Sequence, residues 1–313
     1  MTDIRRPRRG SMAYRPRKRA INQNASVYWK PCEAKRILGI SGYKAGMTQV
    51  SYMDHTESPT KGQEIMSAAT VIEIPPLFVY GVRCYDGYNS LGDVLTNDAT
   101  AMKKMNVKKF ENKAVDESLV KEVRLLVFVQ PDKTGIGKKH AECMELGIGG
   151  KDVKEKLEYA KSLLGKELRV KDVFKPGELV DLIAVTKGKG WQGAVKRFGT
   201  SIQRPKATAK RRHIGTLGQW HPAYILYTVP QAGQTGYHTR TEMNKLVLKV
   251  GDNGNDVNPS GGFTGYGLVK NDYVIVKGSI PGPVKRLVKL RVAVRGAPQK
   301  DPTASYVSKD SIQ

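Results

Sequence analysis

The chain has 313 residues, of which 39% are hydrophobic, and its formal net charge is +24 at pH 7. This length allows one large or two modest domains with a real core, and the charge favours a polyanionic partner. The three cysteines form no C-x-x-C pair and no run approaches 18 apolar residues, which argues against a disulfide framework, a zinc knuckle and a membrane span and for a reducing compartment.

Residues 1–36 form a basic N-terminal segment with eleven Lys or Arg and two acids. No apolar region comes after it that would make it a secretory signal. It has too few apolar residues to bury, so we expect order to begin near Arg36 and the segment alone to be disordered. One interpretation is a generic basic tail of the nuclear-localisation kind. The other, which we favour, is an arm that folds onto RNA.

Short β-branched stretches separated by Gly and Pro come next along the chain, which is typical of a β-barrel core. A turn is expected at 42–46, between the first two strands. In the last strand Lys289 and Arg291 alternate with apolar residues, so they are expected on an outer face that meets phosphates or solvent. The expected strands are 37–40, 47–52, 69–74, 78–83, 179–186, 246–250, 273–277 and 287–295.

Residues 98–181 differ from the rest because they carry 18 basic and 15 acidic side chains and are nearly neutral. Apolar residues at helical spacing predict a helix over 151–164, with Asp152 near its start and Gly165 at its end. We expect this segment to be a helical insertion that packs on the barrel.

Residues 182–241 contain ten Lys or Arg and no acid, interleaved with aromatic rings and three of the five histidines. A solvated basic face normally mixes both signs of charge, so this composition favours phosphates and exposed bases as the partner. Trp220 lies midway between Gly199 and Thr241, which predicts a finger that runs out and back, with a strand-like returning limb over 223–229. The alternative for Trp220 is a core position in the barrel.

Two glycine-rich segments imitate nucleotide-binding motifs. Residues 188–193 fit G-x-G-x-x-G after a strand, but Gly199 and Pro205 interrupt the helix that a dinucleotide site needs, and the next acid is Glu242. Residues 135–139 lack the spacing and the Ser/Thr of a phosphate-binding loop. The histidines have no metal-ligand spacing, and no catalytic arrangement is visible, so we do not expect an enzyme.

Several longer motifs in the chain resemble those of the large-subunit ribosomal protein L-three family, in its archaeal and eukaryotic type. The basic extension argues against the shorter bacterial type. Where eukaryotic members carry a modified histidine, twelve residues before the tryptophan, this chain has Thr208, so that modification is not carried over. The resemblance rests on PRRGS at 7–11, PRKRA at 16–20, GYKAGMT at 42–48, TKGKG at 186–190, GQWHPA at 218–223, GQTGYHTRTE at 233–242 and GSIPG at 278–282.

The resemblance implies a mainly β fold with an α+β insertion, namely a split β-barrel of the translation-protein kind with long extensions that penetrate RNA. It implies a cytoplasmic structural protein, present once per ribosome, that binds large-subunit rRNA near its 3′ end, nucleates assembly and contacts neighbouring ribosomal proteins. No cofactor, small-molecule substrate or membrane is implied, and Mg²⁺ or K⁺ would be held only through rRNA. The expected segments are an arm at 1–36, barrel at 37–97, an insertion of helical or mixed structure at 98–175, barrel again at 176–195 and 242–296, a finger at 196–241 and a tail at 297–313.

The finger tip, Gln219, Trp220 and His221, is expected near the peptidyl transferase centre, with catalysis left to the RNA. A free-standing chromatin-like nucleic-acid binder is the alternative, although repeated modules or a recognition helix would then be more usual. The expected rRNA-binding residues are Arg5, Arg6, Arg8, Arg9, Arg15, Arg17, Lys18, Arg19, Lys44, Lys187, Lys189, Trp191, Lys196, Arg197, Arg204, Lys206, Lys210, Arg211, Arg212, His213, Trp220, His221, Tyr237, His238, Arg240, Lys289 and Arg291.

Overall fold

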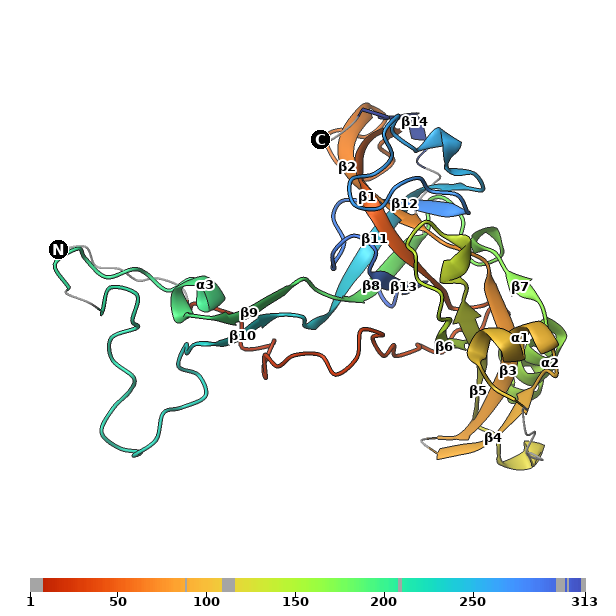
Figure 1. Ribbon diagram of the computed structural model, residues 1–313, viewed down its shortest axis with the longest axis horizontal. Coiled ribbons are helices and arrows are strands. Elements are labelled where there is room, and N and C mark those ends of the chain that lie inside the picture. Colours follow the sequence, from red (N-terminus) through yellow and green to blue (C-terminus); the bar gives the residue numbers. More distant parts are fainter. Residues whose placement is uncertain are drawn as a thin grey trace. The chain divides into compact units, whose positions relative to one another are not determined.

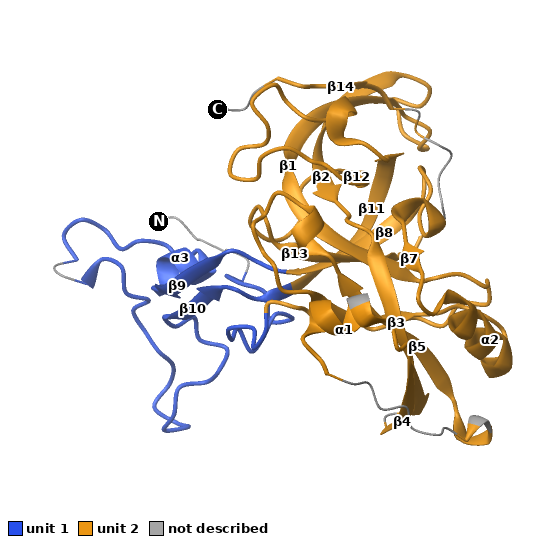
Figure 2. Ribbon diagram, turned by 45° about the vertical axis from the view of Figure 1, so that its right-hand side comes forward, with its two compact units in different colours: residues 1–22, 185–239 blue, residues 23–184, 240–313 orange. Residues whose placement is uncertain are grey.

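The computed structural model describes residues 8–87, 89–108, 116–207, 210–296, 302 and 304–310. The chain divides into two compact units (Figure 2). Unit 1 comprises residues 1–22 and 185–239, and unit 2 comprises residues 23–184 and 240–313. Unit 1 contains β9 (Gly188–Gln192), α3 (Ala194–Phe198) and β10 (Gly233–Gly236).

Unit 2 is built around a closed β-barrel (Figure 1). Hydrogen-bonded neighbours have the order β13, β8, β11, β12, β2 and β1, and β1 also pairs with β13, which closes the ring. Closure leaves these six strands without a free edge, and β14 pairs with the far end of β1. The predicted mainly β fold is confirmed. The strands are β1 (Gly39–Met53), β2 (Glu64–Glu73), β8 (Leu179–Val185), β11 (Thr239–Gly251), β12 (Tyr273–Lys277), β13 (Leu287–Val292) and β14 (Ala304–Val307).

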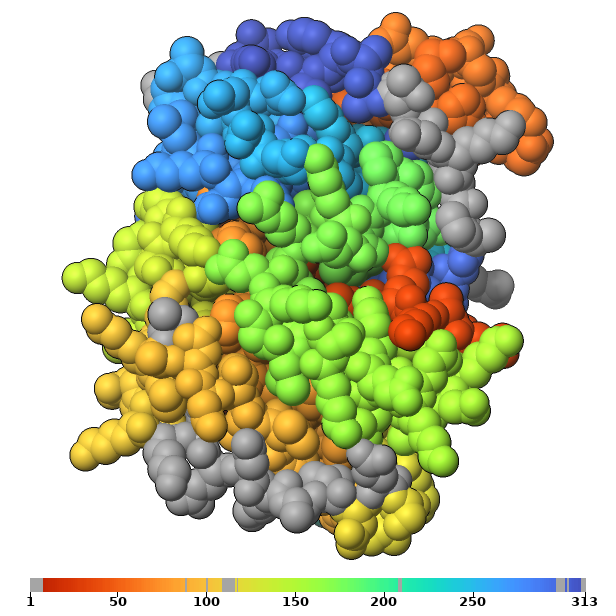
Figure 3. All heavy atoms as spheres, turned by 90° about the vertical axis from the view of Figure 1, so that its right-hand side faces the viewer, coloured from red at the N-terminus to blue at the C-terminus, as the bar shows by residue number. Residues whose placement is uncertain are grey.

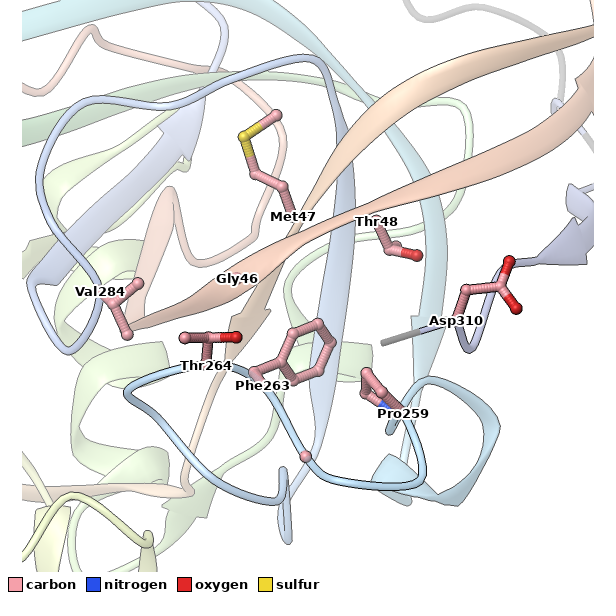
Figure 4. Close-up of a pocket in the computed structure, with 9 residues that line it drawn as sticks. Gly46, Met47, Thr48, Pro259, Phe263, Thr264, Val284 and Asp310 are labelled. Carbon is pink, nitrogen blue, oxygen red and sulfur yellow. The ribbon is translucent and has the colours of Figure 1, made fainter. Parts of the chain in front are cut away.

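The turn expected at 42–46 is wrong, because β1 continues through it. A Cβ at Gly42 would lie 2.4 Å from the carbonyl oxygen of Glu73, and a Cβ at Gly46 would lie 2.5 Å from the ring of Phe263. Glycine therefore serves close packing within a strand here, and not a change of direction. Figure 4 shows the Phe263 ring beside Gly46, where both line a hollow of about 200 Å³.

A second sheet in unit 2 has the order β4, β3, β5, β6, with β7 paired to β3. Along β5, Leu125 and Val127 join the main core with α2, whereas Leu126 and Phe128 pack in a separate cluster with α1. Both faces of this strand are buried, so its apolar run is continuous. The elements are β3 (Leu77–Asp86), β4 (Asn89–Leu95), α1 (Ala99–Met105), β5 (Glu122–Val129), β6 (Glu142–Gly147), α2 (Val153–Leu163) and β7 (Glu167–Leu168), and the short 3₁₀ turns are 117–119, 131–133, 170–172 and 254–256.

The helix predicted over 151–164 is confirmed by α2, which buries Leu157 and Ala160. The topology differs from the expected division at residue 97, because β3 and β4 pair within the second sheet and not with the barrel strands. The expected insertion also contains strands β5 and β6, so it is a mixed segment in which the helices cover a sheet.

Order begins earlier than Arg36, because Trp29 is buried in unit 2 with 8% of its surface exposed. Its ring lies against two glycines, since a Cβ would approach it to 2.7 Å at Gly39 and to 2.6 Å at Gly147. Figure 3 shows the last part of the N-terminal segment, in red, beside the green residues of the α2 region. The expectation of a disordered arm over 1–36 is therefore wrong for its last third, where one tryptophan supplies the burial that the composition lacks.

The outer face expected for Lys289 and Arg291 is wrong, because each is only 7% exposed. Arg291 donates from Nε and Nη2 to Asp181 Oδ2 at 3.1 and 3.0 Å. Burial lowers the pKa of Lys289 to about 8, although Glu145 and Glu142 act in the opposite direction. Lys44 is buried as well, and its Nζ donates to the carbonyl oxygens of Ile280 and Gly282. The second sheet and residues 23–36 cover the face of β13 that carries Lys289 and Arg291. The alternation of β13 alone predicts that this face is exposed.

Candidate nucleic-acid interface

Unit 1 combines dense positive charge with exposed apolar side chains. Its described residues include fifteen Lys or Arg and no Asp or Glu. Trp220 is 87% exposed and Trp191 is 76% exposed, and the other exposed large apolar residues are Tyr14, Ile21, Ile202, Leu217, Tyr224, Ile225, Leu226 and Tyr227. In water alone the like charges repel and such a density of apolar surface is unfavourable. This surface is complementary to phosphates and unstacked bases.

A two-stranded ribbon of β9 and β10 joins the two limbs of the central segment (Figure 1). Trp191 lies opposite Gln234 in its register. Gly236 has a φ of 74°, and a Cβ there would lie 2.0 Å from the carbonyl oxygen of Lys187, so only glycine fits. The next residue, Tyr237, donates its N–H to that same carbonyl at 3.1 Å. Backbone hydrogen bonds, and not an apolar core, therefore hold the ribbon.

Phe198, at the end of α3, is a buried ring shared by the N-terminal arm and the central segment. The guanidinium carbon of Arg17 lies 4.3 Å from its centroid, and those of Arg15 and Arg197 lie 5.2 Å from it. These are cation–π distances. Gly10 also packs on the ring, since a Cβ there would lie 2.3 Å from it. The ring therefore gathers three arginines from two distant parts of the sequence.

Arg197 and Arg17 form reciprocal hydrogen bonds to each other's backbone. Arg17 Nη1 donates to the Arg197 carbonyl oxygen at 3.0 Å, and Arg197 Nη2 donates to that of Arg17 at 3.3 Å. Arg197 also donates to the carbonyl oxygens of Gln234 and Gln231 at 3.0 Å each. Burial, reinforced by the charge of Arg15, lowers the pKa of Arg197 below its usual value. These two side chains hold protein segments together, so they shape the basic surface from within.

A second arm contact lies next to the ribbon. His238 Nδ1 is 2.8 Å from the carbonyl oxygen of Lys18. Because a carbonyl only accepts, that nitrogen carries the proton. Ala20 donates its N–H to the carbonyl oxygen of Tyr237 at 2.8 Å, and the Arg19 guanidinium lies 5.2 Å from the Tyr237 ring. Arg8 Nη2 donates to the carbonyl oxygen of Thr228 at 2.5 Å, so the arm contacts the central segment at the Phe198 ring, beside the ribbon and at Thr228.

Between α3 and β10 the described residues form turns and irregular loops. The strand-like returning limb expected over 223–229 is wrong, because these residues form bends, irregular backbone and a turn at 227–228. The core position considered for Trp220 is excluded by its exposure. The loop is held locally by Gln203, whose N–H donates to the carbonyl oxygen of Arg211 at 2.8 Å. Most of the described side chains of this loop are therefore exposed and can contact a partner.

The expected rRNA-binding residues fall into four groups. Arg5 and Arg6 lie outside the described residues, and Lys44, His238, Lys289 and Arg291 are buried. Arg15, Arg17, Arg197, Tyr237 and Arg240 are half-buried, Arg240 in unit 2 and the others in unit 1. The exposed group lies entirely in unit 1 and comprises Arg8, Arg9, Lys18, Arg19, Lys187, Lys189, Trp191, Lys196, Arg204, Lys206, Lys210, Arg211, Arg212, His213, Trp220 and His221.

Sequence reasoning does not identify Phe198, Gly10 or Gln203 as parts of this unit's framework. A signal for Phe198 is present, because it precedes Gly199, whose φ of 70° ends the helix, and it is a large ring among cations. Gln203 carries no comparable signal, since its role depends on a loop conformation that its neighbours do not specify.

Two searches of the described residues complete the survey of the site. No group of three or more His, Cys, Asp or Glu side chains there could hold a metal ion. None of the helices in that part of the chain is long and apolar enough to cross a membrane.

Comparison with known proteins gives one consistent result. The sequence model of the family described as "Ribosomal protein L3" matches residues 1–312. The "Large ribosomal subunit protein uL3" of Methanothermobacter thermautotrophicus is 46% identical, with 98% of each chain covered. Those of Methanosphaera stadtmanae and Methanopyrus kandleri are 45% and 44% identical, covering 100% and 98% of this chain and 99% and 91% of their own.

Proposed function

This chain belongs to the ribosomal protein L3 family, and we propose that it is a structural, RNA-binding constituent of the large ribosomal subunit. The observation that carries the proposal is the composition of unit 1, where exposed cations and rings occur without any described acid. Folded rRNA supplies both the counter-charge and the stacking surfaces that this unit lacks. The barrel of unit 2 has its own apolar core.

The proposed mechanism is structural. The exposed Lys and Arg side chains neutralise phosphates, so that RNA segments can pack closely around the protein. Arg17, Arg197 and Phe198 keep the arm and the central segment together while the neighbouring cations bind. Peptide transfer belongs to the RNA, and the protein contributes no catalytic group.

The tip of the central segment, Gln219, Trp220 and His221, is proposed to lie near the peptidyl transferase centre. All three side chains are exposed. An indole as exposed as that of Trp220 can stack on a nucleobase, an interaction of about 1–3 kcal/mol. The exposure of Trp220 supports this placement, as does the resemblance of its surrounding segment to that of the family.

Sedimentation of a native lysate tests the proposal. The lysate is run through a gradient at low salt and again after a high-salt wash, and fractions are probed for this chain. Surface phosphate contacts weaken steeply with salt, whereas a segment enclosed by folded RNA is expected to remain. Retention in the large-subunit peak supports the proposal, and release to the top of the gradient would favour the free-standing binder instead.

A further inference from the structure

A hollow of about 400 Å³ opens in unit 1 between the end of β9, α3 and the loop that carries Arg212. It is lined by Gln192, Gly193, Val195, Lys196 and Arg212. This volume falls within the range of small-molecule pockets, roughly 300–1,000 Å³. The hollow therefore offers more room than a phosphate group alone would use.

The two cations of the hollow stand on backbone that is held in place. Within α3, which carries Lys196, the N–H of Arg197 donates to the carbonyl oxygen of Gly193 at 2.9 Å. Gln203 contacts the loop on both sides of Arg212, donating from its N–H to the carbonyl oxygen of Arg211 and from Nε2 to that of His213, at 2.8 and 3.5 Å. The backbone that carries both side chains is thus held by hydrogen bonds within unit 1.

Lys196 and Arg212 differ from the arginines that hold the arm. Among the described residues neither side chain has a hydrogen-bond or ion-pair partner, and unit 1 offers no described carboxylate. Two exposed cations that face one hollow repel each other unless an anion lies between them. A phosphate with its charge-assisted hydrogen bonds fits that requirement, and guanidinium groups suit phosphate particularly well.

Gln192 extends the chemistry of the hollow beyond phosphate. Its Nε2 donates to the carbonyl oxygen of Lys189 at 2.7 Å, which orients the amide and leaves Oε1 as an acceptor. Val195 adds an apolar wall. An acceptor beside an apolar surface suits a sugar hydroxyl or an exocyclic amino group and a base face.

We propose that this hollow binds one unstacked nucleotide of an RNA chain. Lys196 and Arg212 bind its phosphate, and Gln192 accepts a hydrogen bond from its sugar or base. The inference rests on the proposed RNA-binding function of unit 1 and adds a defined nucleotide site to it.

Anisotropy titration of the full-length, RNA-free chain with a short fluorescent oligouridylate tests the site. The test variant is Lys196→Gln with Arg212→Gln. The matched control is Lys187→Gln with Lys206→Gln, which removes the same charge from exposed positions of unit 1 outside the hollow. The test variant is expected to reduce the salt dependence of log K by about 0.7, because both of its cations bind one phosphate, and the control by at most about 1.4, at 0.7 for each phosphate contact. The test variant is expected to lose about tenfold more affinity than the control, as lost charge-assisted hydrogen bonds imply.

A third variant, Gln192→Leu, separates a nucleotide site from a phosphate site. We expect it to weaken oligouridylate binding about fivefold, comparable to one neutral hydrogen bond, without changing the salt dependence. Equal losses in the two double variants would overturn the site and leave only bulk charge. An unchanged affinity for Gln192→Leu would refute the nucleotide in favour of phosphate alone. Competition by free AMP as strong as that by the oligonucleotide would refute an RNA ligand.

These outcomes are independent of the proposed function. If the wild-type chain binds oligouridylate through the hollow but does not sediment with the large subunit, the ribosomal role fails and the site stands. If it sediments with the large subunit but the double variants behave alike, the site fails and the ribosomal role stands.

Discussion

Replacing Arg291 by Met is expected to destabilise the barrel strongly, because it leaves a buried carboxylate without its counter-charge. Asp181 is fully buried, and Arg291 supplies two of its hydrogen bonds. Removing one partner of a buried ion pair typically costs 3–5 kcal/mol. The N–H groups of Asn244 and Val294 still donate to Asp181, at 3.0 and 3.2 Å. We therefore expect the free energy of unfolding to fall by about 3 kcal/mol, the lower end of that range. The free energy of unfolding of a folded domain is roughly 5–15 kcal/mol in total.

Urea unfolding of the full chain, monitored by circular dichroism, measures this loss as a lower midpoint at an unchanged slope. Arg295→Met is the matched control, because Arg295 is exposed four residues further along, and its change should stay within about 0.5 kcal/mol. If Arg291→Met lost less than about 1 kcal/mol, Arg291 would not be buried in the folded chain. The exposed basic face first expected from the strand pattern would then be correct.

Three further predictions concern other parts of the chain. Lys289→Met should raise the free energy of unfolding at pH 7 by up to roughly 3 kcal/mol. The reason is that burial lowers the pKa of Lys289 from 10.5 in the unfolded chain to about 8 in the folded chain, and each pKa unit corresponds to about 1.36 kcal/mol. Since wild type gains stability as the pH rises from 8 to 10.5, the difference between the two should shrink over that interval, and a pH-independent difference in urea unfolding would contradict this. Trp220→Ala should change stability by less than about 0.5 kcal/mol and leave assembly largely intact, yet alter tRNA accommodation or sensitivity to antibiotics that act at the peptidyl transferase centre; wild-type behaviour in both assays would count against a role at the tip. Limited chymotrypsin digestion of the RNA-free chain, read by mass spectrometry, should cut within 8–22 and 199–232 but spare 23–36, and early cleavage after Trp29 would contradict its burial.

Strand composition and charge predicted much of the framework from sequence. The β-branched stretches at 69–74 and 273–277 became β2 and β12, and the helical spacing over 151–164 became α2. These succeed because burial on one face leaves a local periodic signal. The acid-free stretch likewise marked the residues that form most of unit 1, since its charge pattern needs no knowledge of the fold.

The failures arise where distant parts of the chain decide a residue's environment. Arg291 reads as a surface residue until Asp181, 110 positions away, is placed beside it. Gly42 is predicted as a turn residue from its local sequence, whereas its actual role depends on the close approach of the Glu73 carbonyl. The composition of residues 1–36 predicts disorder around Trp29, because Gly39 and Gly147, which lie against its ring, are outside that segment. Strand β5 has no alternation that would predict it, because both of its faces are buried.

The contact between Arg17 and Arg197 has a consequence for the order in which the chain is made. The two residues are 180 positions apart. At roughly 5–20 residues per second of synthesis, Arg17 is added about 10–40 s before Arg197. During that interval the arm is a nascent polycation whose intramolecular partners do not yet exist. Any RNA that meets the arm in this period meets it before the protein can compete for it, so the earliest binding event and the final folded contact are separated in time.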